Sequence, residues 1–214
     1  MPTQIYRTAN GERVPGVTTV ISNLGWNKQA LMYWANQQGL EGKSHRETVQ
    51  KAADAGTLAH AYIEADLQGQ DFPAGDYDQE IIDKAEQAFL NYVDWKNVVG
   101  FAPVGTEIPL VSESLGYGGC LDCVCLINGK HSLWDWKTSN GVYSEYLIQV
   151  AAYKALWEEN NPDKPLSGGI YLLRIDKESA AWAMHFWQSA DPAYEAFKHL
   201  LAIHKLQKTI KRLA

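Results

Sequence analysis

Apolar residues in the first half of the chain recur every three or four positions, which is the period of an α-helix. The clearest case lies between Asp78 and Asn97, where the apolar positions are Ile81, Ile82, Ala85, Phe89, Tyr92 and Trp95. A weaker version of the pattern precedes it and is interrupted at Gly25, a residue that favours chain breaks. The pattern predicts helices over residues 15–36 (one or two short ones), 44–67 and 78–97.

From about residue 106 the pattern changes to short apolar or alternating runs bounded by turn residues, which is typical of β-strands. These runs cover residues 106–112, 119–127, 130–137, 169–175 and 180–187. A helical pattern over residues 143–160 separates the third run from the fourth, and another follows over residues 191–214. This alternation predicts an α/β fold in which helices flank a central mixed β-sheet and an N-terminal helical elaboration precedes the sheet.

The 214 residues, 46% of them hydrophobic, suffice for one substantial core. We expect one domain over residues 1–214, with a mainly helical part (1–100), a sheet core (101–190) and a C-terminal helix (191–214). No apolar run approaches the length of a membrane span, and the N-terminus lacks the basic-then-apolar pattern of a secretory signal. The protein is therefore expected to be soluble and cytoplasmic, without a membrane partner.

Cys120, Cys123 and Cys125 crowd into one short segment, which suits neither a disulfide framework nor a four-cysteine metal cluster. We expect them to be reduced and mostly buried. The net charge of −6 disfavours non-specific coating of nucleic acid. The last 24 residues nevertheless carry +3, from Lys198, Lys205, Lys208, Lys211 and Arg212 against Asp191 and Glu195. This helix is interpreted either as a phosphate-binding rim or as an ordinary solvated face.

The most informative stretch runs from Gly118 to Ser139 and contains Asn128-Gly129 between two apolar runs. This dipeptide is a strong hairpin signal because a type I′ turn needs positive φ at both central residues. A two-residue loop fixes the register, in which paired residue numbers sum to 257. The register predicts that Asp122 faces Asp135.

Two directly opposed carboxylates destabilise a sheet unless a cation lies between them. Lys137 lies two residues after Asp135 and thus on the same face, whereas Trp134 and Trp136 occupy the other face as core. Mg²⁺ or Mn²⁺ at such acids can polarise a phosphate and lower the pKa of a water molecule, and the lysine can stabilise developing charge. The alternative is an ordinary surface ion pair, or a longer loop whose acids point apart.

The order of these residues resembles the RecB-like branch of the PD-(D/E)XK nuclease superfamily, which includes phage and bacterial RecB-type exonucleases and the mitochondrial genome maintenance exonuclease. The resemblance runs from about Val17 to Tyr153, and its motifs are Gly56-x-x-x-His60, Glu107, Gly119-x-x-Asp122, Asp135-Trp136-Lys137 and Gln149-x-x-x-Tyr153. It implies a PD-(D/E)XK (restriction-endonuclease-like) core within a single nuclease domain. By resemblance, the metal ligands are His60, Asp122, Asp135 and the carbonyl of Trp136.

The resemblance also implies that Glu107 helps to hold a second metal or a water, and that Gln149 and Tyr153 brace the site or contact DNA. The chain departs from the family pattern in two ways. The motif acid Asp135 is Asp rather than the commoner Glu, which shortens its reach by one methylene. The dispersed iron–sulfur cysteines of some relatives are absent.

Each of these side chains also has a plain structural interpretation. A lone helical histidine such as His60 is usually a hydrogen-bonded core or surface residue, and Glu64, one turn further on, either orients it or is solvated. Gln149 and Tyr153 could satisfy buried backbone groups. Trp26, Tyr33 and Trp34 lie near Lys28 and either grip single strands or belong to the core.

These features together predict a Mg²⁺- or Mn²⁺-dependent deoxyribonuclease, an exonuclease acting on single-stranded DNA or DNA ends in phage or bacterial recombination or repair. A single-strand-annealing or other recombination protein is a possible partner. One alternative is a structure- or sequence-specific endonuclease, which no recognisable reader helix or zinc finger supports. The other is a non-catalytic DNA-binding subunit. Rings and monomers can share this core, so the sequence predicts no oligomeric state.

Overall fold

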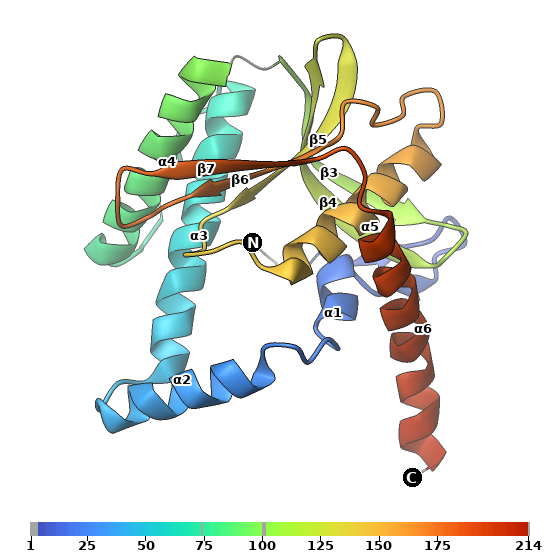
Figure 1. Ribbon diagram of the computed structural model, residues 1–214, viewed down its shortest axis with the longest axis horizontal. Helices are drawn as coiled ribbons and strands as arrows, with labels where there is room; N and C mark the ends of the chain where they lie inside the picture. Colours follow the sequence, from blue (N-terminus) through green and yellow to red (C-terminus); the bar gives the residue numbers. More distant parts are fainter. Residues whose placement is uncertain (1–3, 74, 100–101, 214) are drawn as a thin grey trace.

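The computed structural model describes residues 4–73, 75–99 and 102–213, except for the side chain of Lys208 (Figure 1). The predicted boundary at residues 100 and 101 therefore lies outside the described residues. The elements are β1 (Tyr6–Arg7), β2 (Arg13–Val14), α1 (Val17–Ile21), α2 (Lys28–Leu40), α3 (His45–Gln68), α4 (Gln79–Val99), β3 (Ala102–Ser112), β4 (Tyr117–Ile127), β5 (Lys130–Lys137), α5 (Ser144–Asn160), β6 (Ile170–Ile175), β7 (Trp182–Trp187) and α6 (Asp191–Leu213). No helix in the described part of the chain is long and apolar enough to cross a membrane.

The central sheet has five strands in the order β3-β4-β5-β6-β7. Strands β5 and β6 are parallel and joined through α5, whereas the other neighbours are antiparallel. The predicted α/β class with a mixed sheet flanked by helices is therefore confirmed. The predicted turn is also present, since Asn128 and Gly129 have φ values of 49° and 75°.

Helices cover both faces of this sheet, and each face has its own apolar cluster (Figure 1). Helices α1, α5 and α6 pack on one face around Leu121, Val124 and Leu133. Helices α3 and α4 pack on the other face. Trp134 and Trp136 belong to that second cluster, as predicted. Cys123 and Cys125 are free and buried there, and Cys120 is free and half-buried, which confirms the prediction for the cysteines.

Strand β3 is longer than the sequence pattern predicts, because it begins at Ala102 rather than Thr106. The added residues include Pro103 and Gly105, which are uncommon within strands. The structure accommodates them with a register shift between these two residues, on a strand at the edge of the sheet. Edge strands tolerate proline because an outward-facing position needs no ladder hydrogen bond.

Helix α3 is fixed at both ends and to its neighbour. The Ser44 side chain caps its start by accepting a hydrogen bond from the Glu47 amide, and Gly69 ends it in the left-handed conformation. Asp66 anchors it to α4 by accepting a hydrogen bond from Tyr92 Oη (3.0 Å) and pairing with Lys96 Nζ (2.6 Å). These contacts fix the position of α3, the helix that carries His60.

Helix α2 differs from the rest because none of its residues is buried. Tyr33, on this helix, is 68% exposed, and Trp26, just before it, is 60% exposed, so the interpretation of these rings as core is wrong. Figure 1 shows α2 lying away from the sheet, between α1 and α3. The sequence pattern also missed β1 and β2, because two-residue strands are too short for periodicity to reveal.

Two lysine side chains of helix α6 form contacts within the protein. Lys198 Nζ pairs with Glu195 at 2.8 Å, and Lys205 Nζ donates to the carbonyl of Leu115 at 2.5 Å. The side chain of Lys208 lies outside the described residues. A phosphate-binding role for this helix stays a prediction.

Candidate active site

The site lies where the regular ladder of the sheet is interrupted. The pairing of β3 with β4 includes Thr106–Cys123 and Ile108–Leu121 but leaves out Glu107 and Asp122 between them. Glu107 has a positive φ of 45°, which non-glycine residues rarely adopt. Leu121 and Cys123, two positions apart, pack in opposite clusters, so the strand does not alternate regularly here. The irregularity frees both acidic side chains from ordinary pairing.

The predicted hairpin register holds from Ile127–Lys130 to Cys123–Trp134 and stops there. The expected direct pair of Asp122 with Asp135 is not part of the ladder, so this detail of the prediction is wrong. Asp122 Oδ2 instead accepts a hydrogen bond from the Trp136 amide at 2.9 Å. The physical reason is the interruption beside Glu107, which turns Asp122 toward the backbone of the neighbouring strand.

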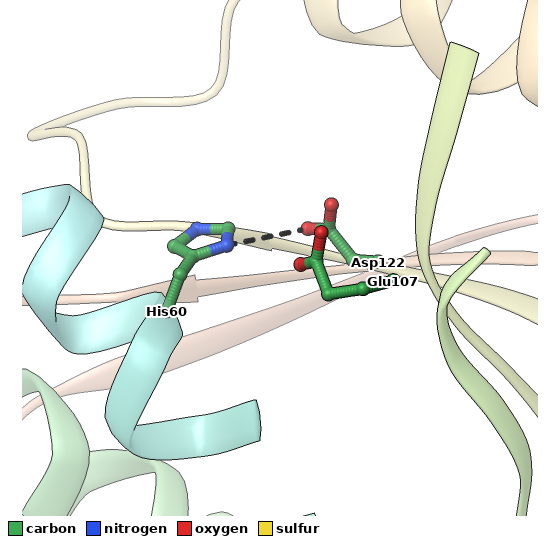
Figure 2. A group of neighbouring side chains, drawn as sticks. All are labelled: His60, Glu107 and Asp122. Carbon is green, nitrogen blue, oxygen red and sulfur yellow. Dashed lines mark ion pairs between the residues drawn. The ribbon is translucent and has the colours of Figure 1, made fainter. Parts of the chain in front are cut away.

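Three ligand groups from three elements converge at this interruption. One donor atom each from His60 on α3, Glu107 on β3 and Asp122 on β4 lies within 4.8 Å of the others. His60 Nδ1 lies 3.7 Å from Asp122 Oδ2. Figure 2 shows the two carboxylates side by side and facing the imidazole ring. These residues also line a hollow of about 410 Å³, so the cluster is accessible from outside.

Asp135 and Lys137 form the other part of the site. Asp135 is fully buried, and its Oδ2 lies 2.5 Å from Lys137 Nζ. Beyond this ion pair, neither carboxylate oxygen accepts a hydrogen bond from any residue that the structure describes. Buried side-chain oxygens normally have at least one such donor. Asp135 therefore has coordinating capacity that the described side chains leave unused.

Burial raises the pKa of all three acids. It raises the pKa of Glu107 to about 7, with a further contribution from Asp122. It raises the pKa of Asp135 to about 6, against the opposing effect of Lys137. The pKa of Asp122 is raised by burial too, although Lys137 and the Trp136 amide lower it. A group of neighbouring acids with raised pKa values indicates a site suited to a cation, because a cation would stabilise their ionised forms.

His60 is a neutral base at physiological pH. Burial and then the nearby Lys137 lower its pKa to about 4, and the charge of Asp135 and a hydrogen bond with the Trp136 backbone only partly offset this. Neutral imidazole is the form that binds metal ions. Glu64 was expected either to orient His60 or to be solvated. Its carboxylate accepts a hydrogen bond from Gln68 Nε2 at 2.9 Å, and none joins it to His60 among the described residues.

Lys137 stays charged in this environment. Burial lowers its pKa, but Asp135 and Asp122 outweigh that effect, and the net pKa is raised. Its ammonium lies 5.1 Å from the centre of the Tyr146 ring, in a cation–π arrangement. Tyr146 was missed in the sequence, although its place one turn before Gln149 on the same helix was a signal for it.

Gln149 and Tyr153 lie together on α5, with Gln149 Nε2 donating to Tyr153 Oη at 2.9 Å. Asp122 and Asp135 both contribute to raising the Tyr153 pKa, after the larger effect of burial. The expected placement of this pair beside the acids is therefore seen. Its bracing role stays a prediction.

The comparisons with known proteins agree with this geometry. The family model described as PD-(D/E)XK nuclease superfamily matches residues 30–213, far more than half of the chain. The chain belongs to the PD-(D/E)XK nuclease superfamily. No curated protein matches it. Among solved structures it is similar to LHK-Exo in complex with dAMP, at 13% identity and a TM-score of 0.36, covering 77% of this chain and 92% of that chain. The family model alone carries the assignment.

PD-(D/E)XK nucleases generally use divalent metal ions, and the residues of this chain fit one. Two carboxylates and an imidazole converge, and a third, buried carboxylate has unused oxygens. Hard oxygen ligands with one nitrogen suit Mg²⁺ or Mn²⁺. The residues that could hold such an ion are His60, Glu107 and Asp122, with Asp135 adjacent. Glu107 is itself part of this cluster, whereas the resemblance implied only that it helps to hold a second metal or a water.

We expect cation binding to strengthen as pH rises through 6–7. The ion competes with the protons that the raised pKa values of Glu107 and Asp135 retain below that range. His60, with its pKa of about 4, stays neutral and adds no competition. At about 100 times Kd the ion stabilises the fold by about 2.7 kcal/mol, or roughly 5–10 °C in Tm for a chain of this size.

Thermal melting with Mn²⁺ and with EDTA at pH 5.5 and pH 8 measures this effect. The Mn²⁺-dependent rise in Tm is expected to be large at pH 8 and small at pH 5.5. An equal rise at both pH values would show that these acids are not the ligands.

Gly119 allows the close approach of α5 to β4. A Cβ atom there would lie 2.7 Å from the Tyr153 ring and 2.9 Å from Leu156 Cδ1. We expect Gly119→Ala to cost about 1–3 kcal/mol, because buried side chains cannot move aside freely. Gly39 is the matched control, since a Cβ there meets nothing within 4 Å. Gly39→Ala should stabilise α2 by about 0.5–1 kcal/mol. Chemical denaturation measures both values, and equal effects would contradict the packing described.

Proposed function

We propose that this chain is a metal-dependent deoxyribonuclease of the RecB-like branch, acting as an exonuclease on single-stranded DNA or DNA ends. The observation that carries the proposal is the convergence of His60, Glu107 and Asp122 beside the buried pair of Asp135 and Lys137. A divalent cation bound there would polarise the scissile phosphate and lower the pKa of an attacking water molecule.

Within this proposal each side chain has a distinct task. Neutral His60 and the carboxylates of Glu107 and Asp122 bind the cation, with Asp135 and the Trp136 carbonyl as further ligands. Asp135 also holds the Lys137 ammonium in place, and that ammonium stabilises negative charge developing on the phosphate. The Gln149–Tyr153 pair on α5 braces the site or contacts the DNA strand.

Exposed rings support a single-stranded or end-processing substrate. Trp26 and Tyr33 are solvent-exposed near Lys28, and aromatic rings beside a cation bind unstacked bases without reading sequence. We further propose that residues 1–214 form one nuclease domain and that it works in the cytoplasm in phage or bacterial recombination or repair. A single-strand-annealing or other recombination protein fits such a role as a partner.

The direct test uses three labelled substrates with Mg²⁺, Mn²⁺ or EDTA. These are linear single-stranded DNA, linear duplex DNA and covalently closed circular single-stranded DNA. We expect degradation of linear DNA only with the metal ions, and an intact circle. Cleavage of the circle would show an endonuclease instead. If no substrate is cut under any condition while DNA is still bound, the chain is a non-catalytic DNA-binding subunit.

A further inference from the structure

A hollow extends from the active site along α3, outside the carboxyl ends of the parallel strands β5 and β6. Lys137 and Lys177 line the same space of about 280 Å³, together with His60. A second hollow of about 410 Å³ adjoins it and shares Thr138, Ser139 and Lys177 with the first. The carboxyl ends of parallel strands are a common place for ligands in α/β proteins.

Lys177 forms no ion pair with a carboxylate among the described residues, although the charges of Glu178 and Asp176 lie close enough to raise its pKa. Its ammonium donates to the Ala52 carbonyl at 3.1 Å. The two acids beside it in sequence have other partners. Asp176 pairs with Arg174 at 3.2 Å, and Glu178 pairs with Lys84 at 3.4 Å.

The surroundings of Lys177 favour an anionic ligand. The side chain is about half-buried, and burial and then the nearby charge of Lys84 lower its pKa, which the charges of Glu178 and Asp176 only partly offset. A partly desolvated cation gains stability from an anion that reaches it. Thr138 and Ser139 add hydroxyl groups to the wall of the hollow, which is also lined by Tyr143, directly before the first residue of α5, and by Asp176 and Glu178. The positive end of the α5 dipole therefore lies beside the hollow.

We propose that Lys177, with Thr138 and Ser139, binds a second phosphate group of the nucleic-acid strand, next to the phosphate that is cut. This inference rests on the proposed nuclease function. The hollow that contains both Lys137 and Lys177 connects the two positions. The bound group is either an internal phosphodiester or a terminal phosphate, and both present the same anionic oxygens to a lysine.

The test compares Lys177→Gln with Lys177→Arg and with the control Lys130→Gln. Lys130 is exposed at the opposite end of β5, next to the hairpin turn. Steady-state cleavage of a single-stranded oligonucleotide is measured between about 50 and 200 mM salt. We expect Lys177→Gln to raise KM about tenfold with little change in kcat. The salt dependence of log(kcat/KM) should become shallower by about 0.7, the loss of one phosphate contact on a single strand.

Lys177→Arg should restore KM, and Lys130→Gln should behave as wild type. Oligonucleotides with hydroxyl or phosphate ends identify the source of the group, because a terminal-phosphate ligand makes the variant's defect vanish on hydroxyl-ended DNA. An unchanged KM and salt slope in Lys177→Gln, or no rescue by arginine, would overturn the inference.

If the wild type cuts nothing, the proposed function fails independently. Fluorescence anisotropy in EDTA then tests the phosphate site on its own. The inference predicts that Lys177→Gln still weakens DNA binding and flattens its salt dependence, and equal binding by wild type and variant would reject it.

Discussion

Replacing Lys137 with alanine is expected to lower kcat for DNA cleavage by about 100- to 1,000-fold, the usual cost of removing one group that stabilises transition-state charge. The ammonium lies beside Asp135 and near the cluster of cation ligands, and it is charged at neutral pH. KM should change little, because the proposed contact to the scissile phosphate strengthens only as negative charge develops. Quenched-flow cleavage of a labelled oligonucleotide at saturating Mn²⁺ measures kcat directly.

The same variant should bind Mn²⁺ at least as tightly as the wild type, because a repelling positive charge has been removed. Its Tm in EDTA should fall, since Asp135 loses the one cation that pairs with it among the described residues, and Mn²⁺ should restore it. Lys130→Ala, on the exposed end of the same strand, is the control for kcat and Tm. Cleavage by Lys137→Ala within about tenfold of the wild type would exclude Lys137 from the proposed role.

Replacing Asp122 with asparagine is expected to separate stability from function. Asparagine can still accept the hydrogen bond from the Trp136 amide, but it lacks the charge that binds a cation. Losing a supporting hydrogen bond to a metal ligand already costs about 10- to 100-fold in affinity. The loss of a direct ligand should therefore weaken Mn²⁺ binding by more than about 100-fold and reduce cleavage correspondingly.

In EDTA, Asp122→Asn should be at least as stable as the wild type. Asp122 raises the pKa of both Glu107 and Asp135, which shows that the three acids repel one another without a cation. Isothermal titration with Mn²⁺ and melting in EDTA measure the two effects, with the exposed Asp163→Asn as control. Wild-type affinity for Mn²⁺ in Asp122→Asn would remove this residue from the site.

Local signals explain why most of the fold was predictable. The Asn128-Gly129 turn fixed the pairing of β4 with β5, because its positive φ values are determined by the two residues themselves. The helical spacing of Gln149 and Tyr153 placed them one turn apart, where they form a hydrogen bond. These are short-range effects that a single sequence contains.

Features that depend on tertiary packing were not predictable in the same way. The positive φ of Glu107 and the interruption at Asp122 arise where three strands and α3 meet, and no local pattern encodes them. The exposure of α2 was also hidden, because a helix that buries none of its residues can have the same sequence pattern as a core helix. The lack of an ion pair at Lys177 was not predictable, because it depends on the pairing of Asp176 with Arg174 and of Glu178 with Lys84.

The central claim is that His60, Glu107 and Asp122 hold a divalent cation together. Anomalous diffraction from crystals grown with millimolar Mn²⁺ at pH 8 tests it most directly. We predict a single strong peak at coordination distance, about 2–2.6 Å, from the imidazole and from at least two of the carboxylates of Glu107, Asp122 and Asp135. A peak elsewhere on the molecule, or none at this cluster, would contradict the account.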